Sequence, residues 1–285
     1  MTVVTNTKTL DHIVHLTPPG SVLETSERFR ELGFKVIPGG THVDGLTANA
    51  LVVFEDGIYL ELISYTHPKS HYPPGTPERE KRDHHEWATK TPGWIDFAFH
   101  GNGSLQNRIS DIINGRARKD RSGAFYVPEW PAGRKRPDGK VLKWVISAPT
   151  PEKRGTLPFF CGDVTPREWR VPADPASNTD HPSTARGIAH VRVLTNNFHT
   201  MSQQLESVIG DPPTSASERE AAWVLDTVNH KGPKLILQAP DSDDEAAFVA
   251  SEGTGIYEVA FLIKHGKSGG SHNTPYGKIK WIPEA

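Results

Sequence analysis

Apolar and polar residues recur with two different periods in the first part of the chain. They alternate along LDHIVHL at residues 10–16, and a period of two predicts a β-strand. Between Val22 and Gly33 the apolar residues recur at helical spacing, and glycine is a natural helix stop. Three strand patterns follow, divided by glycine-rich turns, in FKVIPGG, ANALVVFEDG and IYLELISY. This part of the chain therefore predicts the order βαβββ.

The same order of patterns returns later in the chain. Residues 94–100 predict a strand and LQNRISDIINGR a helix, and the strand candidates after them are FYVPEW, VLKWVISAP and LPFFCGD. A third unit starts at residues 187–194 with GIAHVRVL, and IYEVAFLIK opens a fourth, truncated unit after a short helix near residues 246–250. Each βαβββ unit exposes an apolar sheet face and must pair with another to bury it. We predict an α+β fold with two complete modules and a degenerate pair, its sheets curved around a cup.

Three segments stand outside this repeat. Residues 66–92 are polar and proline-rich, so we expect them to cover the mouth of a cup or contact a partner subunit without adding a strand. Residues 116–140 are rich in basic side chains. The segment either forms a solvated hairpin, which we favour, or binds an anionic ligand. Residues 166–186 form a proline-rich bridge. The predicted domains are a module pair at 8–165, with modules at about 8–66 and 93–165, and a C-terminal region at 187–285.

Composition narrows the classes of partner. The chain has 285 residues, 35% of them hydrophobic, and a formal net charge of −2, so no overall field favours nucleic acid or an anionic membrane. Its first ten residues lack the basic start and apolar run of a signal peptide, and no stretch approaches the roughly 20 apolar residues of a membrane helix. One cysteine, Cys161, suits a reducing compartment. We expect a soluble cytoplasmic protein whose partner is a small molecule and which can form a homodimer.

Two polar side chains stand on strand faces that can meet. In LDHIVHL, period two places Leu10, His12 and Val14 on one face. In IYLELI it places Tyr59 and Glu61 together, so His12 and Glu61 meet if both faces turn into the cup. An imidazole and a carboxylate suit a divalent metal or proton transfer. The alternative is a structural hydrogen-bonded pair.

The motifs of residues 10–65 resemble a known family. LDHIVHL, a helix ending in ELGF, the turn PGGTHVDGLTANALVVFEDG and YLELI together look like the glyoxalase-like branch of the vicinal oxygen chelate superfamily. The likeness continues more loosely to about residue 163. It implies paired βαβββ modules around a cup, with a divalent metal (Mn, Fe, Ni, Zn or Mg) held by the first and last strands. Here that implies His12 and Glu61 as ligands.

The second module departs from the family pattern. In WIDFAFH, period two puts Trp94 and Asp96 on one face, so that Asp96 stands in place of the usual histidine. LPFFCGD offers Phe159 or Phe160 where a carboxylate is expected. The missing ligand comes from Asp96, His42 or water, or the site holds no metal.

Two further polar residues and a second group of charged residues are also candidates for a site. His42 and Asn49 match polar positions of the glyoxalase-like branch, which implies that they contact the substrate or a metal. The alternative is that His42 is a loop residue and Asn49 satisfies a turn. In the C-terminal region His190 and Glu258 can meet, but the neighbouring Arg192 favours an internal ion pair. Nucleotide-binding glycine motifs and hydrolase motifs are absent from the sequence.

Two functions remain open. In the first, a metal-dependent isomerase, lyase or dioxygenase acts on a small oxygen-bearing substrate. The expected metal ligands are His12, Glu61 and Asp96; the catalytic groups are Glu61 and His42; the substrate contacts are Asn49, Tyr59 and Trp94. A metal would act as a Lewis acid on an oxyanionic intermediate. In the second, a metal-free protein binds or sequesters an apolar ligand in the same cup, with Trp94 and Tyr59 stacking on it.

Overall fold

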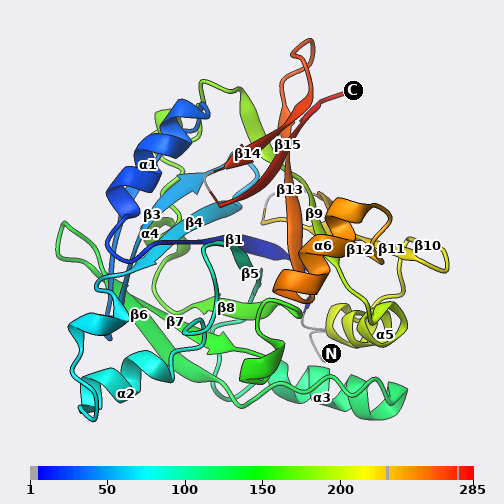
Figure 1. Ribbon diagram of the computed structural model, residues 1–285, viewed down its shortest axis with the longest axis horizontal. Helices are drawn as coiled ribbons and strands as arrows, with labels where there is room; N and C mark the ends of the chain where they lie inside the picture. Colours follow the sequence, from blue (N-terminus) through cyan, green and yellow to red (C-terminus); the bar gives the residue numbers. More distant parts are fainter. Residues whose placement is uncertain (1–5, 229–230, 275) are drawn as a thin grey trace.

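The first eight strands close into a barrel, and the remaining seven form a second sheet beside it (Figure 1). The computed structural model describes residues 6–228, 231–274 and 276–285. Residues 1–5, part of the segment expected to carry no signal peptide, lie outside the described residues. No helix of the described chain is long and apolar enough to cross a membrane. The barrel ends at Asp163 and the second sheet begins at Ala185; the division into two domains stays a prediction.

The first module has the predicted order of elements. They are β1 (Leu10–Thr17), α1 (Val22–Glu31), β2 (Ile37–His42), β3 (Thr47–Val53) and β4 (Tyr59–Tyr65). Within the barrel the strands lie in the order β1-β4-β3-β2, with β1 and β4 parallel. Helix α1 buries Phe29 against the outer side of this wall, and its exposed face carries charged residues.

The second module repeats this arrangement and closes the barrel. Its elements are β5 (Gly93–His100), α3 (Ile109–Asp120), β6 (Trp130–Lys135), β7 (Val141–Ser147) and β8 (Phe159–Asp163). The strand order is β5-β8-β7-β6, equivalent to that of the first module. The two modules meet where β1 pairs with β5 and where β2 pairs with β6, both antiparallel. Paired βαβββ modules in curved sheets are thus confirmed.

The predicted strand at FYVPEW is wrong, because the strand begins where that motif ends, at Trp130. The backbone N–H and C=O of Tyr126 bond to the side-chain amide of Asn114, each at 2.8 Å. The Tyr126 hydroxyl donates to the carbonyl of Pro158. Tyr126 is therefore a fully buried anchor between α3 and β8, and its backbone groups are not available for a continuous strand ladder.

The C-terminal sheet contains a third module and part of a fourth. The third comprises β9 (Ala185–Leu194), α5 (Phe198–Ile209), β10 (Ser215–Ala216), β11 (Glu220–Asp226) and β12 (Lys231–Gln238). The fourth follows α6 (Asp243–Glu252), and its described residues form β13 (Gly255–Ile263), β14 (Gly270–Thr274) and β15 (Gly277–Pro283). The pattern missed the two-residue strand β10, so the third module is complete. Its helix α5 lies beside α3 (Figure 1).

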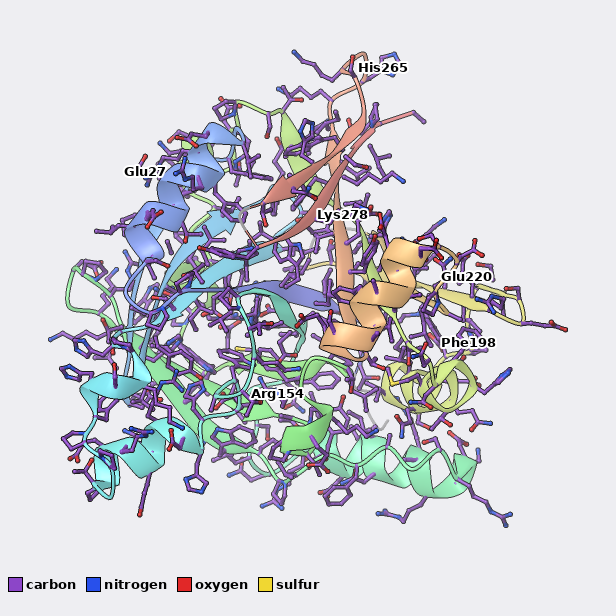
Figure 2. The ribbon with its side chains drawn as sticks, in the orientation of Figure 1. Glu27, Arg154, Phe198, Glu220, His265 and Lys278 are labelled. Carbon is purple, nitrogen blue, oxygen red and sulfur yellow. The ribbon has the colours of Figure 1, made fainter. Side chains whose placement is uncertain are left out.

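Two hydrophobic clusters separate the inside of the barrel from its outside. The inner cluster contains Val14, Ile63 and Phe159, among others, and Figure 2 shows side chains filling the space within the barrel. The outer cluster joins the barrel wall, α1 and the second sheet through rings such as Phe34, Phe54 and Phe261. Alternate residues of one strand therefore enter different cores, as period two requires.

Two register shifts in the β1–β5 pair alter the predicted faces. Leu10 pairs with Phe99 and His12 with Ala98, so β1 carries an extra residue at Asp11 and Leu10 joins the outer cluster, apart from His12. On β5 the extra residue is Ile95. A β-bulge reverses the alternation of faces beyond it, and this places Trp94 outside the barrel.

We expect His15 to limit stability in acid. The ring is fully buried beside Trp94, its Nε2 lies 3.2 Å from Thr274 Oγ1 of the second sheet, and burial lowers the pKa of His15 to about 3. Below about pH 6.5 the imidazole of His15 is protonated in the unfolded chain, whereas in the folded chain it stays neutral until the pH approaches 3. The free energy of unfolding therefore falls by about 1.4 kcal/mol for each pH unit between these values.

Urea unfolding of His15→Gln at several pH values, from about 7 to about 4, checks this expectation, because this range runs from just above the free-histidine pKa of about 6.5 to well below it. The variant should lose less stability on acidification than the parent protein. His199→Gln, at an exposed position of α5, is the control and should keep the parent's pH dependence. Equal acid sensitivity of His15→Gln and the parent would contradict the prediction.

Candidate functional site

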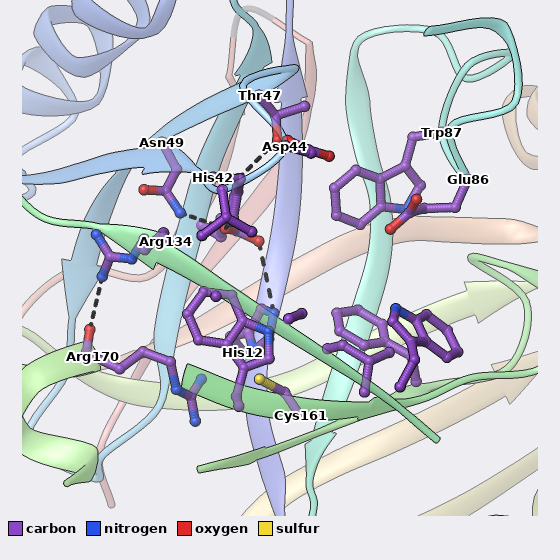
Figure 3. A pocket seen from close by; sticks show the side chains of 18 of the residues that line it. His12, His42, Asp44, Thr47, Asn49, Glu86, Trp87, Arg134, Cys161 and Arg170 are labelled. Carbon is purple, nitrogen blue, oxygen red and sulfur yellow. Dashed lines mark hydrogen bonds and ion pairs between the residues drawn. The ribbon is translucent and has the colours of Figure 1, made fainter. Parts of the chain in front are cut away.

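A pocket of about 250 Å³ opens into the barrel interior (Figure 3). The polar lining that the strands of the first module contribute comprises His12, His42, Thr47, Asn49, Tyr59 and Glu61, and Asp44 adds a carboxylate from the turn after β2. The strand residues come from β1, β2, β3 and β4, and period two turns each of them inwards. The structure thus brings five predicted site residues together: His12, His42, Asn49, Tyr59 and Glu61.

Glu61 lies between two imidazoles. One carboxylate oxygen, Oε2, is 3.7 Å from Nε2 of His12, and the other, Oε1, is 3.7 Å from Nε2 of His42. Asn49 donates an amide hydrogen bond of 2.5 Å to Oε1, which holds the carboxylate in place (Figure 3). The Glu61 side chain is 8% exposed, so these interactions are only weakly screened by solvent.

Each imidazole is oriented by its other nitrogen. His12 Nδ1 lies 2.6 Å from Asp11 Oδ2, and because a carboxylate only accepts, Nδ1 donates this hydrogen bond while Nε2 faces Glu61. His42 Nδ1 lies 2.8 Å from the Thr47 hydroxyl. Tyr59 stacks on the His12 ring with centroids 4.6 Å apart and fixes its plane. Both imidazoles thus turn Nε2 towards the Glu61 carboxylate.

Asp11 is the buried anion behind the site. Burial alone would raise the pKa of its carboxyl, but Arg167 and Arg170 hold that pKa well below its usual range. Both arginines belong to α4 (Arg167–Arg170), and Arg170 also binds Asp163 at the end of β8. Asp11 therefore stays ionised and can orient the His12 ring. Sequence reasoning assigned Asp11 no role, because its bulged position on β1 is not visible in the period-two pattern.

The second module contributes an apolar and cationic wall. Its lining residues include Trp130, Arg134, Trp144, Ile146, Arg154, Phe159 and Cys161. The single thiol, Cys161, is fully buried and its pKa is raised well above the usual range, mainly by that burial. A thiol in this state is not a nucleophile. Sequence reasoning assigned none of the arginines or tryptophans of this wall to the pocket.

Asp96 and Trp94, two predicted site residues, do not line the pocket. Asp96 has no exposed surface; it pairs with Arg154 at 2.8 Å and accepts hydrogen bonds from Trp87 Nε1 and the backbone of Gly155. Trp94 lies outside the barrel because of the bulge at Ile95, and its Nε1 donates to the carbonyl of Lys278 in β15. The expected three-ligand face of His12, Glu61 and Asp96 does not form.

The residues present do not fit the metal set that paired modules would supply. Ala98 lies opposite His12 in the β1–β5 pair, and β8 turns Phe159 and Cys161 inwards where a carboxylate is expected. Within the described residues, no group of three or more His, Cys, Asp or Glu side chains is placed to hold a metal ion. The chemistry available at the site is therefore that of the Glu61 carboxylate and its two imidazoles.

Part of the insertion at residues 66–92 lines the pocket. Within them the described chain has η1 (Lys69–His71) and α2 (Pro77–Asp83) and adds no strand to the barrel. His85, Glu86 and Trp87 line the pocket, and Trp87 is tied to Asp96. The Arg82 guanidinium lies 3.2 Å from the centroid of the Tyr65 ring and holds α2 against β4.

The second group of candidate residues, which includes His190 and Glu258, forms an ion-pair network on the C-terminal sheet. His190 Nε2 lies 2.9 Å from Glu258 Oε1, and Arg192 contacts Glu245 at 2.5 Å and Gln238 at 2.8 Å. The arrangement agrees with the internal ion pair that the sequence favours, and none of these residues lines the barrel pocket.

Comparison with known proteins gives one family and a set of shared folds. A family model described as a glyoxalase-like domain matches residues 10–209. No curated protein matches the chain. A hypothetical protein from Staphylococcus aureus superposes with a TM-score of 0.67 at 13% identity, over 97% of this chain and 99% of that one.

Two structures with assigned activities share the fold more distantly. They are 2,2',3-trihydroxybiphenyl 1,2-dioxygenase from Sphingomonas wittichii strain RW1 (TM-score 0.50, 10% identity, 97% of this chain and 90% of that one) and the Mn(II)-bound glyoxalase from Novosphingobium aromaticivorans (TM-score 0.50, 10% identity, 98% and 83%). Identities this low show the fold alone.

Removing the Asp96 carboxylate should destabilise the protein strongly. Asp96→Ala leaves Arg154, whose side chain is 3% exposed, as an unpaired buried cation, and we expect a loss of about 3–5 kcal/mol in the free energy of unfolding. The double variant Asp96→Ala/Arg154→Met should regain most of this loss. Chemical denaturation measures both.

The control for this prediction is an exposed ion pair. Arg28 and Glu31 lie 3.2 Å apart on α1 with side chains 54% and 67% exposed, so Glu31→Ala should cost no more than about 1 kcal/mol. A loss for Asp96→Ala as small as that for Glu31→Ala would show that the Asp96–Arg154 pair does not secure the barrel.

Proposed function

Since this chain belongs to the glyoxalase-like domain family of vicinal oxygen chelate proteins, we propose that it is an enzyme that transfers a proton on a small, oxygen-bearing organic substrate inside the barrel. The observation that carries the proposal is the Glu61 carboxylate with an imidazole Nε2 at 3.7 Å from each oxygen. A carboxylate and two oriented imidazoles can take up, hold and return a proton. Isomerase and lyase reactions of carbonyl compounds need such a step.

Each residue has a role in this proposal. Glu61 removes a proton from the carbon beside the substrate carbonyl, and Asn49 holds the carboxylate at the right place through its 2.5 Å hydrogen bond. His12, fixed by Asp11, and His42, fixed by Thr47, stand ready to accept that proton and return it to another atom of the substrate. No step uses a divalent metal, because the donor groups do not fit one.

The rest of the pocket favours this chemistry by excluding water. Trp87 of the insertion, with Trp130, Trp144, Ile146 and Phe159 of the second module, surrounds the polar cluster. A cavity that combines an apolar wall with convergent polar groups is typical of sites for small molecules. Within it the charge of Glu61 is poorly solvated, which strengthens its interaction with the substrate.

A protein that only binds or sequesters a ligand is the second candidate. The observation that favours it is the tryptophan-rich lining, which suits stacking on an apolar ligand. Turnover separates the two candidates, because sequestration leaves the ligand unchanged.

The test is proton exchange with solvent. A panel of small oxo and hydroxy compounds is incubated in D₂O with the chelator-treated protein, and deuterium incorporation at carbon is followed by NMR. Glu61→Gln, which keeps the shape but not the base, should slow incorporation by at least about 100-fold. Glu31→Gln, on the exposed face of α1, is the control and should match the parent protein.

Three outcomes would overturn the proposal. They are exchange that survives in Glu61→Gln, exchange that is lost on chelation and restored by added Mn²⁺, and tight binding of a panel compound with no exchange at any carbon. The second outcome would show that the enzyme depends on a metal, and the third would show that the protein binds its ligand without turning it over.

A further inference from the structure

Arg134 of β6 is a buried cation in the wall of the pocket. It pairs with His42 in the antiparallel register of β2 and β6, so the two residues are neighbours at the closure of the barrel. Trp130, Ala132 and Arg134 share the inward face of β6 by period two, and all three line the pocket. Arg134 is only 3% exposed. Its charge is therefore held away from solvent and beside the Glu61 cluster.

Arg134 has hydrogen-bonding capacity that the described residues leave unused. Its Nη2 donates to the carbonyl of Arg170 at 3.2 Å, whereas Nη1 has no partner among them and no described carboxylate lies within ion-pair distance (Figure 3). A guanidinium without an anion is costly to bury, and burial lowers the pKa of Arg134. Nη1 itself is enclosed by protein, and a ligand can approach this charge only through the part of Arg134 that lines the pocket.

The two other arginines of the pocket differ from Arg134. Arg154 is paired with Asp96 at 2.8 Å, and Arg170 is paired with Asp11 at 2.7 Å and with Asp163 at 2.6 Å. Their charges are compensated within the protein. Among the described arginines of the pocket, Arg134 is the one with no carboxylate within ion-pair distance.

We propose that Arg134 binds a carboxylate of the substrate, so that the substrates are small carboxylic acids with an aromatic or apolar body. Arg134 is a single cation without an ion-pair partner among the described residues, and it matches a singly charged carboxylate better than a doubly charged phosphate. The apolar body then lies along Ala132 towards Trp144, which is its partner residue on β7, and Trp130. The substrate class deepens the proposed function, but binding at Arg134 does not require proton transfer.

The arrangement also explains how an anion enters a pocket that contains Glu61. Two carboxylates repel each other in a site of low dielectric, and a guanidinium between them offsets this repulsion. With its carboxylate on Arg134, the ligand places the adjacent carbon towards His42 and Glu61, since His42 is the register partner of Arg134 and lies 3.7 Å from Glu61. The anion site thus positions the reacting carbon.

The experiment compares two probes of nearly the same shape, phenylacetate and phenylacetamide, by calorimetry or NMR titration. The parent protein should bind phenylacetate at least about tenfold more tightly, the discrimination expected of a charged hydrogen bond of about 1.4 kcal/mol. Arg134→Met should lose this preference, and Arg134→Lys should keep part of it. Arg118→Gln, at an exposed position of α3, is the control and should keep all of it.

Folding is checked in the same variants. Because the Arg134 guanidinium has no ion pair to lose, Arg134→Met should unfold at the same denaturant concentration as the parent protein or a higher one. Should Arg134→Met fail to fold, Arg134→Lys decides: full retention of the parent's preference overturns the proposal and partial loss supports it. A preference that survives in folded Arg134→Met overturns it, as does tighter binding of phenyl phosphate than of phenylacetate.

Glu61→Gln separates this inference from the proposed function. It should bind phenylacetate as tightly as the parent or more tightly, because a negative charge near the ligand is removed. If it binds and still catalyses exchange, the proposed function fails and the anion site stands. If it loses exchange while Arg134→Met keeps the preference for phenylacetate, the anion site fails and the proposed function stands.

Discussion

The buried carboxylate of Asp11 is the charge around which the site is built. It is fully enclosed, and Arg167 and Arg170 keep it ionised. Through His12 it sets which imidazole nitrogen faces Glu61, and through Arg170 and Asp163 it joins the first strand of one module to the last strand of the other. A buried anion with three cationic or hydrogen-bonding partners is stable only if all of them keep their positions. The geometry of the site and the closure of the barrel are therefore coupled.

The two modules have the same topology and different chemistry. The first supplies the polar cluster of His12, His42, Asn49 and Glu61, and the second supplies apolar residues and arginines. In the second module Ala98 lies opposite His12, and β8 turns Phe159 into the pocket. This asymmetry gives one pocket with a reactive wall and a wall that can hold a ligand. Neither module alone would enclose that pocket, because its lining comes from both.

The C-terminal sheet supports this barrel from outside. Its apolar face packs on the outer side of the first module through Phe261, Trp281 and their neighbours around Phe34. Trp94 and His15, on the outward faces of β5 and β1, contact β15 and Thr274 of that sheet. Its own polar network around His190 is satisfied internally. The sheet thus covers apolar barrel residues that would otherwise face water.

The sequence by itself determined the order of elements and the inward face of the first module. Period two, helical spacing and turn residues are local signals, and they correctly predicted β1, α1, β3 and β4 and brought His12 and Glu61 to one pocket. The tertiary structure alone decided the bulges at Asp11 and Ile95 and the inward face of Arg134. Register and bulges depend on pairing with strands far away in the sequence. No local pattern can therefore show that Trp94 turns outwards, that Asp96 is used by Arg154, or that one arginine of a basic hairpin lies inside the barrel.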